Sequence, residues 1–179
     1  MTLSFTQTIN GKPNYFIHKI WRCILKRKLN DADFVSFCYQ PWFKKFGETV
    51  PMMDGVDVPE KLHTIREYRT TKTGERAKKQ WKSGDKIHPA INNRSKNYFQ
   101  FAPTIECNSV QEICINRKSG MPNITIDGKE FYYWDCEIEN GYPLLHQLAI
   151  NDGFDSVDDF LNYFSDGTRQ LIHWTDLKY

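Results

Sequence analysis

The clearest periodic pattern in the chain is helical and lies near the N-terminus. Between residues 16 and 25, apolar side chains return every three or four positions, while basic residues occupy the opposite side. The apolar positions are Phe16, Ile17, Ile20, Trp21, Ile24 and Leu25. Before them, Leu3–Ile9 alternates like a short strand, Asn10-Gly11 favours a turn, and Pro13 suits the first turn of a helix. We therefore expect a strand, a turn and a core-facing helix.

A different period, two residues, dominates the second half. Ile105–Ile115 alternates but changes parity, which predicts one long strand that is bent or bulged near Asn108-Ser109. Two β-rich runs, 123–126 and 130–134, flank Asp127-Gly128, a pair typical of tight hairpin turns that need positive φ. We expect a hairpin here.

Shorter apolar runs predict three further strands. The first covers Lys86–His88 and is expected to stop at Pro89, since proline cannot donate to a sheet. Tyr98–Phe101 is the second, and Gln170–Trp174 is the third, which we expect to close the sheet. Before the first of these strands, Arg69–Lys82 is polar and lacks an apolar period, so it predicts a mobile loop whose end returns to the body of the protein.

Two more helices are expected near the C-terminus. Pro143 suits the start of the first, and Gly153 suits its end. Ser156 and Asp159 match a capping box, followed by an apolar face up to Phe164. Several strands, three or four helices and no repeat together predict an α+β fold.

The segment from about 29 to 60 interrupts this layout. Asp31 suits a helix cap, and we predict that the helix ends before Pro41, because proline disfavours helical geometry in the residue ahead of it. The rest is too apolar for a free linker. Residues 34–53 either pack over the core, which is the favoured interpretation, or form a docking surface for a protein partner.

Length and composition favour one domain over residues 1–179, with an insertion at about 29–60. No apolar run is long enough to span a bilayer, and the first residues lack the features of a secretion signal, so a cytoplasmic protein without membrane contact is expected. The five cysteines are odd in number and contain no CxxC pair, and the histidines form no metal-binding pattern. We therefore expect reduced thiols, no metal and no cofactor.

Charge is unevenly distributed although the net charge is only +2. Residues 60–96 hold eleven Lys or Arg against four Asp or Glu, whereas residues 130–179 hold two against ten. A basic run is often only a solvated face, but this one contains aromatic residues, which favours nucleic-acid contact. The candidate contact residues are Lys61, Arg66, Arg69, Arg76, Lys78, Lys79, Trp81, Lys82, Arg94, Lys96 and Tyr98.

At the start of the basic run, Lys61, Thr64 and Arg66 bring an amine, a hydroxyl and a fixed cation into one short segment. This Lys-x-x-Thr-x-Arg pattern resembles the signature of the ASCH family, a branch of the small PUA-like barrels associated with RNA. The resemblance implies a mixed β-barrel with flanking helices, to which this chain adds a helical insertion before the motif. Pro59-Glu60 stand where the family usually has a glycine.

The threonine form of the motif is similar to a subset of the family that removes an acyl group from acetylated cytidine. The resemblance implies a working triad of Lys61, Thr64 and an acidic residue on a helix, which would fall at Asp152. Residues three apart in a regular strand face opposite sides, so Lys61 and Thr64 can share a site only in a turn, bulge or helical turn. In the enzyme hypothesis the protein is an amidohydrolase, and this requires residues 61–64 to form a turn, a bulge or a helical turn.

Two alternatives to turnover remain open. In the binding hypothesis, Lys61 and Arg66 hold phosphate, the downstream cations follow an RNA backbone, and Trp81 or Tyr98 stacks on a base of single-stranded RNA or of a modified nucleoside. In the third hypothesis the protein is an interaction module that docks through residues 34–53. An exposed patch there would favour this hypothesis, and a buried one would not.

Overall fold

The computed structural model describes residues 1–27, 29–55, 58–118, 121–133 and 141–179. The chain forms two compact units. The first consists of Met1–Lys61 and Lys86–Glu106, and the second of Leu62–Asp85 and Cys107–Tyr179. Each unit combines helices with β-sheet, so the α+β prediction is confirmed. The described strands form sheets of four, five and two strands, none of which closes into a barrel.

In the first unit, a small sheet is built around β5. Its strands are β1 (Thr2–Ser4), β5 (Lys86–Ile91), β6 (Phe99–Gln100) and β7 (Ile105–Glu106), beside a separate pair, β2 (Thr8–Ile9) and β3 (Lys12–Pro13). β1 pairs with β5 in parallel, whereas β6 and β7 pair with it antiparallel. The strand expected over Leu3–Ile9 is thus divided between β1 and β2, and Asn10-Gly11 forms the turn into β3 with positive φ at both residues.

β5 does not stop at Pro89, which corrects that prediction. β7 pairs with Lys86 and Ile87, and β6 pairs with Ala90 and Ile91, so Pro89 lies between the two paired stretches. The missing N–H of proline therefore interrupts no ladder on that side, while its carbonyl still accepts from the amide of Phe101 at 3.1 Å.

The predicted N-terminal helix is confirmed as α1 (Phe16–Leu25). Its apolar side is buried, and Trp21 donates its indole N–H to the carbonyl of Phe101 at 2.8 Å. Pro13, expected in its first turn, lies instead in β3.

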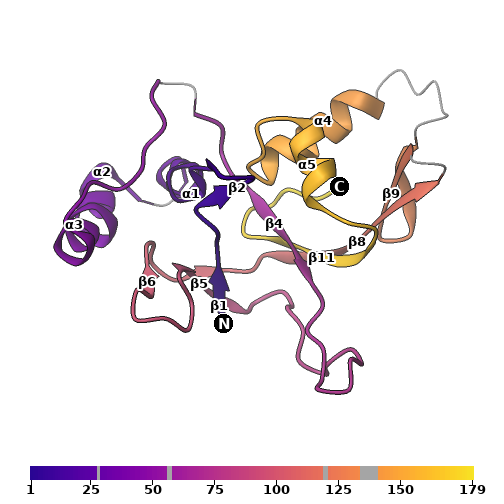
Figure 1. Ribbon diagram of the computed structural model, residues 1–179, viewed down its shortest axis with the longest axis horizontal. Helices are drawn as coiled ribbons and strands as arrows, with labels where there is room; N and C mark the ends of the chain where they lie inside the picture. Colours follow the sequence, from indigo (N-terminus) through magenta and orange to yellow (C-terminus); the bar gives the residue numbers. More distant parts are fainter. Residues whose placement is uncertain (28, 56–57, 119–120, 134–140) are drawn as a thin grey trace. The chain divides into compact units, whose positions relative to one another are not determined.

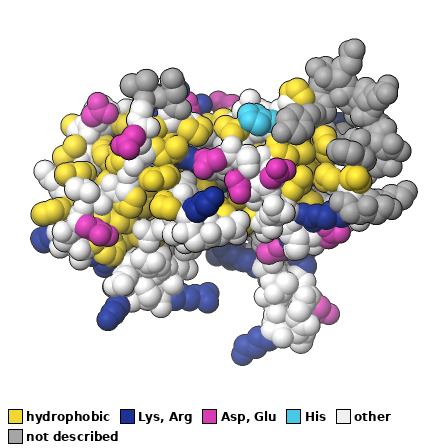
Figure 2. Space-filling model, turned by 45° about the horizontal axis from the view of Figure 1, so that its top comes forward, with side chains coloured by type: hydrophobic (Ala, Val, Ile, Leu, Met, Phe, Trp, Pro, Cys, Tyr) yellow, Lys and Arg dark blue, Asp and Glu magenta, His cyan; other side chains and the backbone are white. Residues whose placement is uncertain are grey.

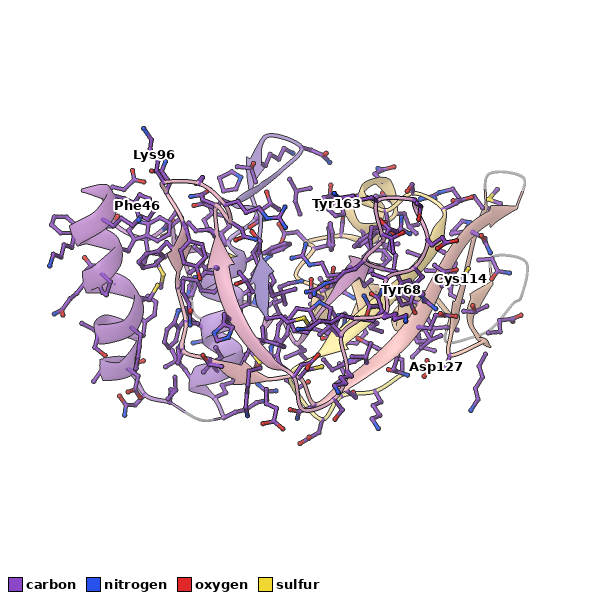
Figure 3. All side chains as sticks on the ribbon, turned by 90° about the horizontal axis from the view of Figure 1, so that it is seen from below. Phe46, Tyr68, Lys96, Cys114, Asp127 and Tyr163 are labelled. Atoms are coloured by element: carbon purple, nitrogen blue, oxygen red, sulfur yellow. The ribbon has the colours of Figure 1, made fainter. Side chains whose placement is uncertain are left out.

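The first part of the insertion, residues 31–46, folds as one continuous helix, drawn on the left of Figure 3. It comprises α2 (Asp31–Phe34), the π-helical turn η1 (Val35–Tyr39) and α3 (Gln40–Phe46). Asn30, not Asp31, is the cap, and its side chain accepts from the amide of Asp33. The helix continues through Pro41, contrary to prediction, because the wider π turn makes room for the proline ring, which then occupies the first turn of α3.

The second unit contains a five-stranded antiparallel sheet in the order β10-β9-β8-β11-β4. The strands are β4 (His63–Glu67), β8 (Ser109–Lys118), β9 (Met121–Ile126), β10 (Lys129–Tyr133) and β11 (Gly167–His173). Two helices, α4 (Gly141–Asn151) and α5 (Val157–Tyr163), lie next to one another on one side of this sheet (Figure 1). β11 lies between β8 and β4, so it is an interior strand and does not close the sheet as predicted.

The turn and cap predicted from local sequence in this unit are present in the structure. Asp127 and Gly128 have φ of 51° and 74°, as the predicted tight hairpin requires. The amide of Asp159 donates to the Ser156 side chain at the start of α5, and Gly153 follows α4 with φ of 92°. The long strand expected over Ile105–Ile115 is interrupted close to the predicted bend, and its two parts, β7 and β8, pair in different sheets. Trp134, the last residue of the expected hairpin, lies outside the described residues.

No helix within the described residues combines the length and the apolar character needed to cross a membrane.

Candidate functional site

The motif spans the junction of the two units. Lys61 is the last residue of the first unit's N-terminal segment, and Thr64 and Arg66 lie in β4 of the second. Lys61 and Leu62 precede β4, so the segment between Lys61 and Thr64 is not a regular strand throughout. Because each unit is described by itself, a pairing of Lys61 with Thr64 stays a prediction.

Lys61 is held against α1 within the first unit. Its side chain has no exposed surface, and its amide donates to the carbonyl of Lys19 at 3.1 Å. The ammonium lies 4.5 Å from the ring centre of Phe16, within the range of a cation–π contact. Phe16 also lines a cavity of about 500 Å³ with Pro51 and Met52. Helix α1 thus gives the motif lysine an aromatic environment.

Asp152 is buried in the second unit, directly after α4, and it approaches the motif there. Its carboxylate Oδ1 lies 3.4 Å from Nδ1 of His63, the first residue of β4. The other ring nitrogen of His63 is 2.8 Å from the hydroxyl of Tyr179, which also accepts from the Asn151 amide at 2.8 Å. Burial raises the pKa of Tyr179, and the hydrogen bond from Asn151 opposes this. The hydroxyl is therefore protonated at neutral pH.

His173 completes this buried polar cluster, which we define as His63, Asp152, His173 and Tyr179. His173 and His63 face each other across β11 and β4, with ring centres 5.2 Å apart. Neither ring nitrogen of His173 has a hydrogen-bond partner within the described part of the chain. Burial, and then the neighbouring His63, lower the pKa of His173 to about 3, so this ring is neutral at pH 7.

Arg66 lines a second feature of this unit, which we call the Arg66 pocket. This cavity of about 450 Å³ is formed by residues 65–67, residues 163–165 and Arg169. Burial holds the pKa of Arg66 below its ordinary value, while Asp152 and Tyr163 oppose this. Glu67 and Arg169 are directly opposite on β4 and β11 and form an ion pair at 2.5 Å.

The loop between β4 and β5, residues 69–82, is anchored at its base by side-chain amides. The Gln80 amide group accepts from the backbone N–H of Arg69 at 2.9 Å and donates to its carbonyl at 2.8 Å, as a neighbouring strand would. Gln170 of β11 accepts from the amide of Trp81 at 3.0 Å. The loop base thus has a defined conformation, and residues 70–76 form a turn closed by the bridge between Thr70 and Arg76.

Most cations of this loop form no ion pair with an acidic residue that the structure describes. Arg76 forms an ion pair with Glu112 at 3.1 Å and stacks on the ring of Tyr68. None of the other loop cations makes an ion pair with a residue in the described ranges; these are Arg69, Lys72, Lys78, Lys79 and Lys82. All but Arg69, which is half-buried, are exposed.

A cavity of about 660 Å³ lies against this loop, and we call it the loop pocket. It is lined by Tyr68, by residues 80–83 and 108–112, and by the cations Arg76 and Lys178, among others. The predicted residues Arg76, Trp81 and Lys82 therefore come together here. Trp81 is only 7% exposed and has Arg69 at 5.5 Å from its ring, so little of its surface is accessible for stacking.

The remaining predicted contact residues belong to the first unit. Arg94 and Lys96 are exposed in the turn between β5 and β6, and Tyr98 is 38% exposed directly after it. The basic run is thus divided between the units, with the larger group of cations in the second.

Residues 34–53, expected as a possible docking surface, include both buried and exposed aromatic side chains. Trp42 is buried against Phe99, with ring centres 5.5 Å apart, and covers the small sheet. Phe37 and Phe43 are 49% and 55% exposed. Hydrophobic side chains accordingly gather over this part of the first unit in Figure 2. A partner bound through 34–53 stays a prediction.

Cys23, Cys38 and Cys107 are buried, and burial raises the pKa of the Cys38 thiol to about 12. Cys114 is half-buried and free, and Cys136 lies outside the described residues. No group of three or more His, Cys, Asp or Glu side chains within the described ranges is arranged to hold a metal ion.

Sequence reasoning missed both histidines of the buried cluster and the tyrosine of the Arg66 pocket. His173 lies in an apolar strand, and only its register with His63 shows that the two rings meet. Tyr163 ends α5, and nothing in the local sequence distinguishes it from a surface tyrosine. The fold is mixed α+β, and its second unit has a cationic loop beside the loop pocket.

Comparison with known proteins adds no relative: no protein-family model, no curated protein and no solved structure matches this chain.

Proposed function

We propose that this chain binds single-stranded or looped RNA, or a modified nucleoside, through the loop 69–82 and the neighbouring cavities of the second unit. The observation that supports this most is the set of loop cations that form no ion pair with a carboxylate in the described part of the chain. Uncompensated cations on one loop attract a polyanion and release its counterions on binding. We also propose a PUA-like fold of the ASCH type, as the Lys-x-x-Thr-x-Arg motif at the start of β4 implies.

The anchoring of the loop supports the same proposal. Gln80 and Gln170 hold the loop base through amide hydrogen bonds, so its cations need little further ordering when a ligand binds. The ligand contacts are phosphate contacts, which give affinity without sequence readout. Bases enter the cavities, where shape and stacking favour unpaired nucleotides over a duplex.

Salt-dependent binding of labelled single-stranded RNA, followed by fluorescence anisotropy, tests the proposal. The double variant Lys78→Ala/Lys79→Ala removes two exposed loop cations, and we expect affinity at low salt to fall by roughly tenfold to a hundredfold. The matched control is Lys12→Ala/Lys44→Ala, which removes two exposed cations of the first unit and should bind like the wild type. Affinity that is indifferent to salt, or an equal loss in the control, would reject the loop as the binding element.

A second candidate function is the amidohydrolase, and one observation favours it. Thr64 and Asp152 are both buried in the second unit, and Asp152 reaches His63 beside the motif threonine. In this hypothesis water adds to the acyl carbon, the bond to the cytidine nitrogen breaks, and a carboxylic acid and a free amine leave. Lys61 or Asp152 would take the proton from the attacking group and return it to the amine.

Mass spectrometry of acylated cytidine after incubation with the protein tests this candidate. The acyl group should be lost with the wild type and retained with Lys61→Ala and with Thr64→Ala. If the wild type leaves the substrate intact, the enzyme hypothesis fails while the binding proposal stands.

A further inference from the structure

The helix formed by α2, η1 and α3 carries two apolar stripes, and the first unit covers one of them. The covered stripe has a residue at every fourth position, namely Phe34, Cys38, Trp42 and Phe46. Phe34 packs against Trp21 of α1, with ring centres 5.2 Å apart, and Phe46 packs against Phe99 of β6 at 5.8 Å. This stripe therefore attaches the helix to the first unit.

The second stripe lies one position further along the helix and is exposed. Val35, Tyr39 and Phe43 are 40%, 39% and 55% exposed. Residues four apart drift by about 40° around the axis of a regular α-helix, but the wider turn over Val35–Tyr39 holds more residues and offsets part of this drift. The three side chains thus share one side, and Figure 3 shows side chains of this helix that point away from the rest of the first unit. One apolar stripe is enough to attach a surface helix, so the second is available for another contact.

The two ends of this helix carry opposite charges. Asp31 and Asp33 lie in its first turn, and Lys44 and Lys45 lie in its last. Glu48 follows the helix and reduces the positive charge there without cancelling it. Asp31 and Lys44 are exposed, and neither forms an ion pair with a residue that the structure describes. The helix therefore presents an acidic start and a basic end to solvent.

A helix with this pattern is complementary to a second copy of itself. If two copies lie antiparallel about a twofold axis near Tyr39, Val35 of each copy meets Phe43 of the other, because both residues are equally far from Tyr39. The same arrangement brings Asp31 of one copy close to Lys44 of the other and opposes the two helix dipoles. A parallel arrangement would place like charges side by side.

We propose that residues 31–46 form a dimer interface, in which the helices of two copies of this chain pack antiparallel through Val35, Tyr39 and Phe43. The helix is about 24 Å long, and one of its faces offers less than the roughly 800 Å² per partner of a standard interface, so the dimer is weak and forms at micromolar concentrations. The inference does not rest on the proposed function, because the loop 69–82 belongs to the second unit and a short RNA strand needs only one such loop.

Sedimentation equilibrium of the protein without RNA, at about 1 to 200 µM, tests the proposal. The weight-average mass should rise with concentration from 21.2 kDa toward twice that value. For Tyr39→Ala/Phe43→Ala, we expect dimer affinity to fall by roughly tenfold to a hundredfold, as for two central residues of an interface. The matched control is Met121→Ala/Leu144→Ala, which removes two apolar side chains of comparable exposure from the second unit and should dimerise like the wild type.

Exchange of the charges tests the antiparallel arrangement. Asp31→Lys and Lys44→Glu each place like charges together in the proposed dimer, so each variant alone should dimerise more weakly than the wild type. An equimolar mixture of the two variants should dimerise more strongly than either alone, because every contact in the mixed dimer again joins opposite charges. A structural defect in the variants would not be repaired by mixing. Thermal unfolding of each variant shows that it is folded.

Three results would overturn the proposal. A wild type that stays monomeric over the whole concentration range would show that the exposed stripe does not bind a second copy, and would leave it to a different partner. Wild-type dimerisation in Tyr39→Ala/Phe43→Ala would place the dimer contact on another surface. If the single charge variants dimerise like the wild type, or if mixing them restores nothing, the helices do not pack antiparallel. None of these results depends on whether the protein binds RNA.

Discussion

The loop 69–82 and the buried cluster of His63, Asp152, His173 and Tyr179 are both polar, and both adjoin the same strand, β4. In the loop, the charges except that of Arg69 are exposed, and most form no ion pair with an acidic residue in the described ranges. In the cluster, His63, Asp152 and His173 are buried, Tyr179 is half-buried, and His63 contacts each of the other three. The loop therefore presents its charges to solvent, whereas the cluster side chains pack where β4, β11 and the end of α4 meet.

Stability below neutral pH gives the largest expected effect and concerns the cluster. The pKa of His173 is lowered from 6.5 to about 3 in the folded protein, so between these values the unfolded chain binds a proton that the native ring does not. Stability is therefore retained above pH 6.5 and falls as the pH decreases toward 3, by up to roughly 1.4 kcal/mol per pH unit. Urea unfolding at a series of pH values measures this.

His173→Phe should reduce that dependence, because the variant has no ring to protonate at this position. The groups that face His173 are His63, Asp127, Asp152 and Lys178, and they stay unchanged. His146→Gln, an exposed histidine of α4, is the control and should keep the wild-type slope. Equal slopes in the two variants would contradict a depressed pKa at His173.

An intermediate effect is expected at the point where the loop joins the core. Gln170 is 1% exposed and accepts from the amide of Trp81. Gln170→Ala leaves this buried N–H without its acceptor, which should destabilise the protein by about 1–3 kcal/mol. Urea unfolding compares it with Gln40→Ala on exposed α3, where a change below about 0.5 kcal/mol is expected. A loss in Gln170→Ala no larger than this control would show that the loop does not depend on the core.

The smallest effect belongs to a single loop charge. Lys82→Gln should leave the free energy of unfolding within about 0.5 kcal/mol of the wild type, because the side chain is exposed. It should still lower the slope of log affinity against log salt concentration by about 0.7, the contribution of one phosphate contact. Lys44→Gln is the matched control. If both variants show the wild-type slope, Lys82 contacts no phosphate.

The comparison also explains which parts of the site could be predicted. The cations of the loop are consecutive in the sequence, so their concentration in one place needs no tertiary information. The cluster brings together residues 63, 152, 173 and 179, which meet only because β4 pairs with β11 and α4 ends beside them. The Arg66 pocket could not be predicted from the sequence for the same reason, because its lining residues come from β4, from the end of α5 and from Arg169.

By itself, the sequence determined the elements whose causes are local. Helix α1 follows from apolar spacing, the β9–β10 hairpin from Asp127-Gly128, and the start of α5 from the Ser156 cap. Only the tertiary structure showed where a proline does not end a helix or a strand. The helix continues past Pro41 because a π turn precedes it. Pro89 lies inside β5 because β7 and β6 pair with the residues before and after it. Strand order and buried contacts depend on pairing between distant segments, whose free energy is gained only when the whole core assembles.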